Sequence, residues 1–265
     1  MNTPASQSRP HLPQVTLVAV TSVNVAATLA ALKANLAQIR FGACKLFTDA
    51  QIAALPKAIE LVPIAPLNSA RAYSDFMLRS LVDHLETPHC LVTQWDGHVV
   101  DSRRWRPEFL DYDYIGASWP QFADDYDVGN GGFSLRSRAL MEACRNPAFR
   151  QSHPEDIAIG RDNRAWLETQ GLRFAPRALA DVFSAERAGN PSSSFGYHGV
   201  WHMPRLLGAE AFWDIYRGLD ERAGIRPDFL SILGQLVVGR GGASRAIEMV
   251  RDRIRDALSV RKTGL

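Results

Sequence analysis

The sequence has few cysteines, no apolar run long enough to cross a bilayer, and almost no net charge. Its three cysteines, Cys44, Cys90 and Cys144, are too widely spaced to indicate a metal site or a disulfide framework. A reducing, cytoplasmic environment is therefore expected. The segment at the N-terminus is polar and lacks the apolar core of a secretory signal.

Positive and negative charges are nearly balanced in the sequence. The chain has 30 Lys and Arg against 28 Asp and Glu, a formal charge of +2 at pH 7. A nucleic-acid-binding protein usually concentrates basic residues on one face, so no nucleic-acid partner is expected. The P-loop, GxGxxG, GxSxG and CxxC patterns are also missing, which excludes the enzyme classes that these motifs mark.

The hydrophobic pattern predicts an α/β domain. Apolar, β-branched runs predict strands over 15–22, 41–49, 60–67 and 89–95, and apolar residues at helical spacing predict helices over 24–39 and 69–86. This order is typical of a mostly parallel sheet flanked by helices. Short strands over 112–118 and 131–137 and a helical segment within 153–176 are expected next. We expect a flexible tail over 1–13, this domain over 14–205, and a helical C-terminal extension over 206–265.

Polar residues follow three of the predicted strands. Thr21 and Ser22 follow the first, Asp49 ends the second, and Gln94 to Asp96 follow the strand that begins at His89. Open α/β sheets bind ligands beyond the carboxyl ends of their strands. The sequence therefore predicts a polar rim at this edge of the sheet, where a nucleotide would bind.

The stretch Gln94-Trp95-Asp96-Gly97 has two interpretations. A carboxylate at a strand end can bind a divalent cation that in turn holds a diphosphate, since hard cations prefer oxygen ligands. An aspartate before a glycine is equally typical of a simple turn. The stretch by itself does not decide between the two.

Two further stretches also have a structural and a functional interpretation. The glycine-rich segment around Asn130, Gly131 and Gly132 either forms a hairpin turn or brings backbone close to a sugar or phosphate. Glu155 and Asp156, after Pro154, either stabilise a helix N-terminus or include a general base.

The segment FGYHGVWHMP (195–204) carries two histidines in a loop of glycine and aromatic residues. Histidine is a common ligand of transition metals, although a lone histidine is usually structural. The spacing of His198 and His202 would suit a zinc pair only on a helix. Gly199 and Pro204 argue against a helix there, and no HExxH pattern is present.

Taken in order, the segments VTLVAVTS, YSDFMLRSLVDHLETPHCLVTQWDGHVV, YDYIGASW, VGNGGFSLRSR, PEDIAIGR and FGYHGVW resemble the GT-A glycosyltransferases. More narrowly, the chain is similar to a poorly characterised family of bacterial and fungal proteins with a predicted glycosyltransferase fold. The resemblance covers roughly residues 14–205. It implies a GT-A-like, Rossmann-type fold and a nucleotide-sugar donor.

The resemblance also implies roles for individual residues. The reaction would be an inverting sugar transfer to a glycan or other hydroxyl acceptor, in bacterial surface-glycan synthesis, assisted by Mn²⁺ or Mg²⁺. Asp96 and His198 correspond to metal ligands, and Glu155 or Asp156 to the base. The donor would meet Thr21, Ser22, Asp49, Arg71, Asp75, Gln94, Trp95, Asn130, Gly131 and Gly132.

One position departs from the family pattern. The usual Asp-x-Asp motif is Gln94-Trp95-Asp96 here, so one negative charge is missing and metal dependence stays open. This favours an alternative hypothesis, a non-catalytic nucleotide-sugar or carbohydrate-binding protein on the same fold. A nucleotidyltransferase is a third hypothesis, but the chain lacks a glycine-rich, basic phosphate loop after its first strand.

The predicted C-terminal helices lie outside the resemblance. They combine apolar residues with Arg251, Arg253, Arg255, Arg261 and Lys262. Three interpretations are open: a contact with the inner face of a membrane, a homo-oligomer interface, and a solvated helix face. The composition favours the solvated face.

Overall fold

A computed structural model describes residues 9–262, and the chain forms two compact units, Met1–Gly199 and Val200–Leu265. The division falls before residue 200, earlier than the expected limit after 205. The first strand begins at His11, inside the segment expected to be a tail, because Leu12 is buried and His11 and Leu12 pair with the second strand. The rest of the expected tail, residues 1–8, lies outside the described residues.

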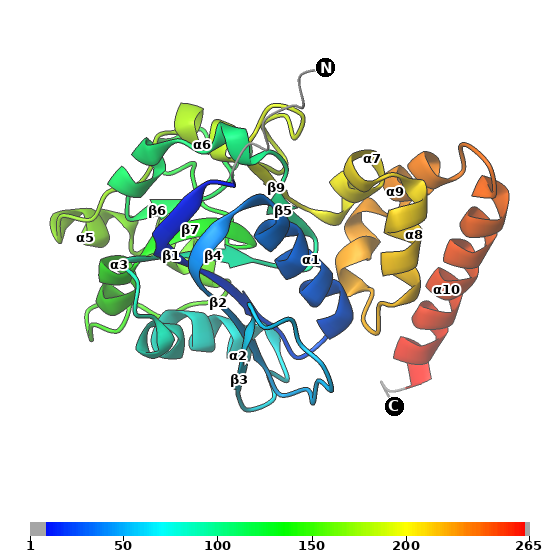
Figure 1. The fold of residues 1–265 in the computed structure, drawn as a ribbon, viewed down its shortest axis with the longest axis horizontal. Coiled ribbons are helices and arrows are strands. Elements are labelled where there is room, and N and C mark those ends of the chain that lie inside the picture. Colours follow the sequence, from blue (N-terminus) through cyan, green and yellow to red (C-terminus); the bar gives the residue numbers. More distant parts are fainter. Residues whose placement is uncertain (1–8, 263–265) are drawn as a thin grey trace, which may run out of the picture. The chain divides into compact units, whose positions relative to one another are not determined.

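The first unit is built on a six-stranded sheet with the order β3-β2-β1-β4-β7-β6 (Figure 1). Neighbours among the first four strands pair in parallel, while β7 is antiparallel to both β4 and β6. The expected mixed α/β class, with a mostly parallel sheet, is confirmed. The strands are β1 (His11–Val20), β2 (Arg40–Thr48), β3 (Glu60–Pro63), β4 (His89–Thr93), β6 (Tyr114–Ile115) and β7 (Phe133–Ser137).

Both faces of this sheet are buried, as the near-continuous apolar runs of its parallel strands predict. In β1, Leu17 and Ala19 pack in one apolar cluster with Leu32 of helix α1 (Val25–Gln38). Val18 packs in a second cluster with Met77, from the helical segment between β3 and β4. Alternate residues of a strand point to opposite faces, so helices cover both sides of the sheet.

The two longer helices expected in the first unit are each divided into short pieces. The segment expected over 69–86 consists of α2 (Ala70–Asp75), a π-helical turn (Phe76–Ser80) and a 3₁₀ turn (Leu81–His84). The segment within 153–176 starts as α4 (Glu155–Ile157), continues as a π-helical turn (Ala158–Asp162) and ends as α5 (Arg164–Thr169). Two other helices of this unit are α3 (Arg138–Ala143) and α6 (Arg177–Phe183).

A second, three-stranded sheet has the order β5-β9-β8. It consists of β5 (Gly97–Val99), β8 (Ser184–Ala185) and β9 (Gly196–His198). Buried Asn35 of α1 supports it: its side-chain Oδ1 accepts from the Val99 backbone N–H at 2.9 Å, and its Nδ2 donates to Thr93 Oγ1 at 3.3 Å. This contact fixes β5 to the end of β4.

In the second unit, every named element within residues 200–262 is helical. Its helices are α7 (Met203–Leu207), α8 (Ala209–Arg217), α9 (Phe229–Leu236) and α10 (Gly242–Lys262), joined by 3₁₀ segments that include Ala223–Asp228. They are coloured yellow to red in Figure 1. Among residues 9–262, no helix has the length and apolar character needed to span a membrane.

Candidate active site

Two strand ladders bring distant segments of the first unit to one point. In the larger sheet, β4 pairs with β7 so that Thr93 lies opposite Phe133, and the next N–H, of Gln94, donates to the Gly132 carbonyl at 2.9 Å. In the smaller sheet, β5 pairs with β9 so that Gly97 lies opposite His198. The end of β4, the glycine-rich loop and His198 are therefore held together by backbone pairing.

The stretch that begins at Gln94 is a tight turn between β4 and β5. The Gly97 N–H donates to the Gln94 carbonyl at 3.2 Å, and Thr93 Oγ1 donates to the Gly97 carbonyl at 2.7 Å. Glycine is required at 97, since a Cβ there would lie 2.7 Å from the Tyr197 carbonyl oxygen. The stretch is therefore a turn, and this turn brings Gln94 and Asp96 to the ring of His198.

His198 is surrounded by three oxygen-bearing side chains. Its Nε2 lies 3.2 Å from Gln94 Oε1 and 3.3 Å from Asp96 Oδ1, and its Nδ1 lies 3.3 Å from Glu186 Oε1. The side chains of His198, Asp96 and Glu186 are 14%, 13% and 12% exposed. The sequence predicted the proximity of His198 and Asp96 but not the role of Glu186.

Two opposed effects act on the pKa of His198. Burial lowers it, since a buried ring is harder to charge, whereas the carboxylates of Asp96 and Glu186 favour the charged ring. The carboxylates prevail and raise the pKa of His198 to about 10. The ring is therefore protonated at neutral pH unless another positive charge takes the place of the proton.

The donor atoms around Nε2 form an incomplete set of ligands for a divalent cation. Within residues 9–262, no three His, Cys, Asp or Glu side chains are grouped so that they could hold a metal ion. The side chain of Gln94 contributes an amide oxygen as a further donor atom beside those of Asp96 and His198. In the same part of the chain, Asp96 Oδ1 is buried and accepts no hydrogen bond. A Cβ at Gly132 would lie 2.1 Å from His198 Nε2, so only glycine leaves this space free.

Glu155 forms a buried ion pair. Its Oε1 lies 3.0 Å from an Nη atom of Arg136, a side chain of β7 with no exposed surface. The same guanidinium donates to the Gly131 carbonyl at 3.3 Å and, through Nε, to Ser134 Oγ at 3.0 Å. Ser74 Oγ lies 3.5 Å from Glu155 Oε2. Glu155 is thus bound to the core beneath the glycine-rich loop.

Asp156 also contacts this loop and is half-buried. Its Oδ2 accepts from the Gly131 N–H at 3.2 Å and its Oδ1 from the Ile157 N–H at 2.8 Å. Burial raises the pKa of Asp156, the neighbouring Glu155 charge raises it further, and the two N–H donors oppose this. The net effect is a pKa above the ordinary range of an aspartate. Both carboxylates also lie in the first turn of the helical segment that continues to Thr169.

The loop conformation depends on Asn130. This buried residue has φ of 47°, in the left-handed region that asparagine tolerates better than most residues, and its Oδ1 accepts from the Gly132 N–H at 3.1 Å. A Cβ at Gly131 would lie 2.4 Å from Glu155 Oε1. The segment therefore turns at Asn130, and its glycine backbone packs closely against the side chains of Glu155 and His198.

The remaining predicted donor residues lie on three other segments. Ser22 Oγ accepts from the Leu67 N–H at 2.8 Å, and Thr21 Oγ1 bonds to the Val23 backbone. Asp49, after β2, and Arg71, on α2, are exposed. Asp75 ends α2 and Trp95 lies in the turn after β4, both half-buried. His202 belongs to the C-terminal unit and lies against Trp201.

Four residues that bear on the site were not singled out from the sequence: Asn35, Tyr73, Arg136 and Glu186. Tyr73 accepts from Gln94 Nε2 at 3.2 Å and so fixes which end of the amide faces His198. Arg136 carried no signal, since it takes a polar position in the regular alternation of Phe133, Ser134 and Leu135. Glu186 carried none, because its partner is distant in the sequence.

The family model described as protein of unknown function (DUF5672) matches residues 57–198. This is more than half of the 265 residues, so the chain belongs to this family. The matched range begins after β2 and ends at His198 itself. It contains the turn after β4, the glycine-rich loop, Glu155 and Asp156. No curated protein sequence matches the chain.

Several solved structures are similar to the chain. A mannosyltransferase of Pyrobaculum calidifontis, PcManGT, in complex with GDP-Man and Mn²⁺, is 13% identical with a TM-score of 0.43, over 99% of this chain and 81% of that one. GlyE, a glycosyltransferase of Streptococcus pneumoniae, is 10% identical with a TM-score of 0.43, over 84% and 64%. A glycosyltransferase that glycosylates the major capsid of PBCV-1 is 9% identical with a TM-score of 0.40, over 69% and 93%. At these scores the likenesses do not decide the chemistry of the site.

Proposed function

We propose that the chain is a glycosyltransferase that moves a sugar from a nucleotide-sugar donor to an acceptor hydroxyl, with inversion and with the help of a divalent cation. One observation carries the proposal. Gln94, Asp96 and His198 converge on one side of the loop Asn130–Gly132, and Asp156 bonds to the same loop through Gly131. A cation-binding group and a base beside one glycine-rich loop suit transfer between a diphosphate-linked donor and a hydroxyl.

The atoms around His198 Nε2 fit Mn²⁺ or Mg²⁺. Gln94 Oε1, Asp96 Oδ1 and His198 Nε2 would hold the cation, since the two oxygens lie 3.2 and 3.3 Å from the nitrogen. When bound, the cation would act as a Lewis acid that stabilises the charge of the departing diphosphate. Since Gln94 contributes no charge, phosphate oxygens of the donor would complete the set of ligands.

Asp156 is the proposed base, and Glu155 is a positioning residue. Asp156 is half-buried and has a raised pKa, which suits a group that must accept a proton near neutral pH. It would take the proton of the acceptor hydroxyl as the oxygen attacks the anomeric carbon and the bond to the diphosphate breaks. Glu155 is already neutralised by Arg136, so it fixes the loop and the start of the helix.

The donor is assigned to the carboxyl ends of β1, β2 and β4. Thr21, Ser22 and Asp49 would meet the base and ribose, as the strand-end rule predicts. Gly131 and Gly132 would border the sugar, because neither has a side chain that fills the space between Asp156 and the residues around His198. Arg71, Asp75, Trp95 and Asn130 complete the proposed donor set.

The three cysteines are free and buried, which supports a reducing compartment, and we place the reaction in the cytoplasm. A role in bacterial surface-glycan synthesis rests on the resemblance of the sequence motifs alone.

A thermal-shift screen of nucleotides and nucleotide sugars, with and without Mn²⁺, tests this function. A ligand at 100 times its Kd stabilises the folded state by about 2.7 kcal/mol, so the donor class is detectable. We expect one nucleotide series to raise Tm more with Mn²⁺ than without it. Asp96→Ala and His198→Ala should lose the difference. If no nucleotide raises Tm in either condition, the proposal is wrong.

The second candidate function, a non-catalytic nucleotide-sugar-binding protein, is favoured by Gln94, which brings no charge to the site. Product analysis after incubation with the bound nucleotide sugar and hydroxyl acceptors separates the two. Release of free sugar or formation of a glycoside supports the transferase. Binding without turnover for every donor and acceptor supports the binding protein.

A further inference from the structure

The last helix of the C-terminal unit presents an apolar face to solvent. Ile247, Val250, Ile254 and Leu258 are 53%, 39%, 55% and 56% exposed. Their spacing of three or four residues places them on one side of α10. Met249, on the other side, has no exposed surface. The helix is therefore apolar on the face that is not used for packing within its own unit.

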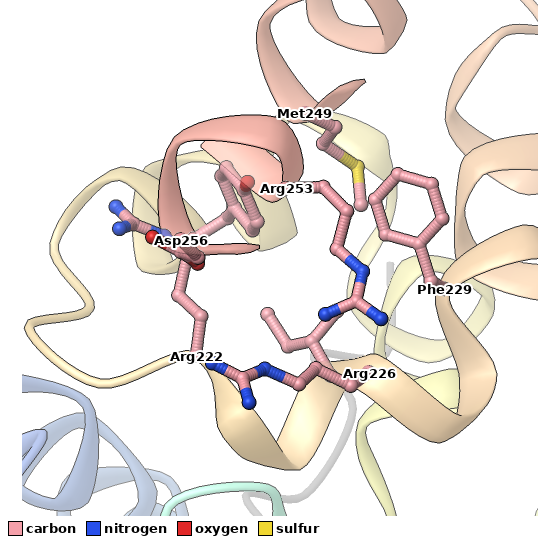
Figure 2. Close-up of a pocket in the computed structure, with 8 residues that line it drawn as sticks. Arg222, Arg226, Phe229, Met249, Arg253 and Asp256 are labelled. Atoms are coloured by element: carbon pink, nitrogen blue, oxygen red, sulfur yellow. The ribbon is translucent and has the colours of Figure 1, made fainter. Parts of the chain in front are cut away.

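Arginines surround a pocket beside this helix (Figure 2). Arg222 and Arg226 come from the segment before α9, and Arg253 comes from α10. Its apolar lining includes Ile225, Phe229 and Met249, and Asp256 is the carboxylate among its lining residues. Within residues 9–262, Arg222 Nε is buried and has no hydrogen-bond partner. The pocket lining therefore carries more positive than negative charge, and Arg222 Nε is available there to donate a hydrogen bond.

Two more arginines, Arg251 and Arg255, lie near the apolar face and are exposed. Asp252 is turned inward, where it accepts from Tyr216 Oη at 3.2 Å, and it also pairs with Arg255 at 3.0 Å. Glu248 is exposed and adds one negative charge, which leaves the arginines in excess. Arg251 and Arg255 therefore border the apolar face of α10, whereas the pocket lies on the side of the helix that carries Met249.

We propose that this face of α10 binds an anionic lipid surface. Ile247, Val250, Ile254 and Leu258 would enter the boundary between headgroups and acyl chains, and the guanidinium groups would meet lipid phosphates. A second copy of this chain fits the face less well, because a two-fold contact would bring the same arginines against each other. The inference concerns the C-terminal unit alone and does not depend on the proposed transferase.

Vesicle sedimentation of the full chain tests the proposal. We expect binding to vesicles of phosphatidylcholine with phosphatidylglycerol, and little binding to phosphatidylcholine alone. Ile254→Gln should weaken binding roughly tenfold, since it removes one buried aliphatic side chain. Arg251→Gln should weaken it about fivefold and reduce its dependence on salt.

Matched variants in the first unit, Val23→Gln and Arg79→Gln, change an exposed apolar and an exposed basic residue, and both should bind like the wild type. Ile254 and Arg251 are exposed, so circular dichroism and Tm should show both variants folded. The proposal is overturned by equal binding to both kinds of vesicle or by no binding. It is also overturned if the chain is a dimer in solution that Ile254→Gln dissociates, or if inorganic phosphate raises Tm while vesicles do not bind.

Discussion

Nε2 of His198 lies 3.2 Å from Oε1 of Gln94, although the two residues are 104 positions apart in the sequence. Two ladders create this contact: β4 with β7 positions the glycine-rich loop at Gln94, and β5 with β9 positions His198 opposite Gly97. Backbone hydrogen bonds thus fix the positions from which the two side chains meet.

Asp156 and Glu155 should respond differently to loss of charge. Asp156→Asn should lower sugar transfer by a factor of about 10²–10⁴, the usual contribution of a general base, with the free energy of unfolding within about 1 kcal/mol of wild type. Glu155→Gln should lower the free energy of unfolding by about 3 kcal/mol, because it leaves the Arg136 charge buried without its partner. Urea unfolding and product formation measure the two effects. Equal activity losses with unchanged stability would contradict the assignment.

The pH dependence of the reaction should reflect the raised pKa of Asp156. A base acts in its charged form, so kcat/KM should fall as the pH drops through this pKa, at a higher pH than the value of about 3.9 for a free aspartate. The folded state also holds this proton more tightly than the unfolded state. The corresponding stability is present at low pH and is lost as the pH rises through the folded pKa. A rate profile that stays flat down to pH 4, with the chain still folded, would argue against Asp156.

Gly132→Ala should disturb the site more than a glycine substitution elsewhere. The new Cβ would lie 2.1 Å from His198 Nε2, so the ring must move, at a cost of about 1–3 kcal/mol. We expect the Mn²⁺-dependent part of the nucleotide thermal shift to disappear. Gly234→Ala is the matched control, since no atom lies within 4 Å of its added Cβ. If both variants keep the Mn²⁺ response, Gly132 does not border a cation.

Glu186 should matter for metal affinity through His198. Its carboxylate lies 3.3 Å from Nδ1, where it fixes the orientation of the ring and makes Nε2 a better ligand. Glu186→Gln should weaken Mn²⁺ binding about 10–100-fold, as measured by calorimetry on the full chain. Glu142→Gln, an exposed glutamate on α3, is the control. Unchanged Mn²⁺ affinity in Glu186→Gln would limit its role to packing.

Much of the fold could be predicted from local patterns. The strands β1, β2 and β4 and helix α1 follow the apolar runs closely, because a strand buried on both faces and a helix with an apolar side each leave a periodic signal. The helices expected over 69–86 and 153–176 were predicted as continuous and are divided in the structure. Periodicity shows which residues face the core, but it does not reveal π-helical and 3₁₀ turns that shift the phase within a helix.

The sequence by itself determined that polar groups gather at the strand ends, and it brought Asp96 and His198 into one hypothesis. It left Glu155 and Asp156 equivalent, because adjacent carboxylates at a helix start look alike. Tertiary structure separated them, since Arg136 of β7 reaches only Glu155 and neutralises it. It also supplied Glu186, which follows β8, and Tyr73 of α2, whose contacts with the site no sequence spacing reveals. Charge and burial depend on the folded surroundings of a side chain, and these surroundings differ between Glu155 and Asp156.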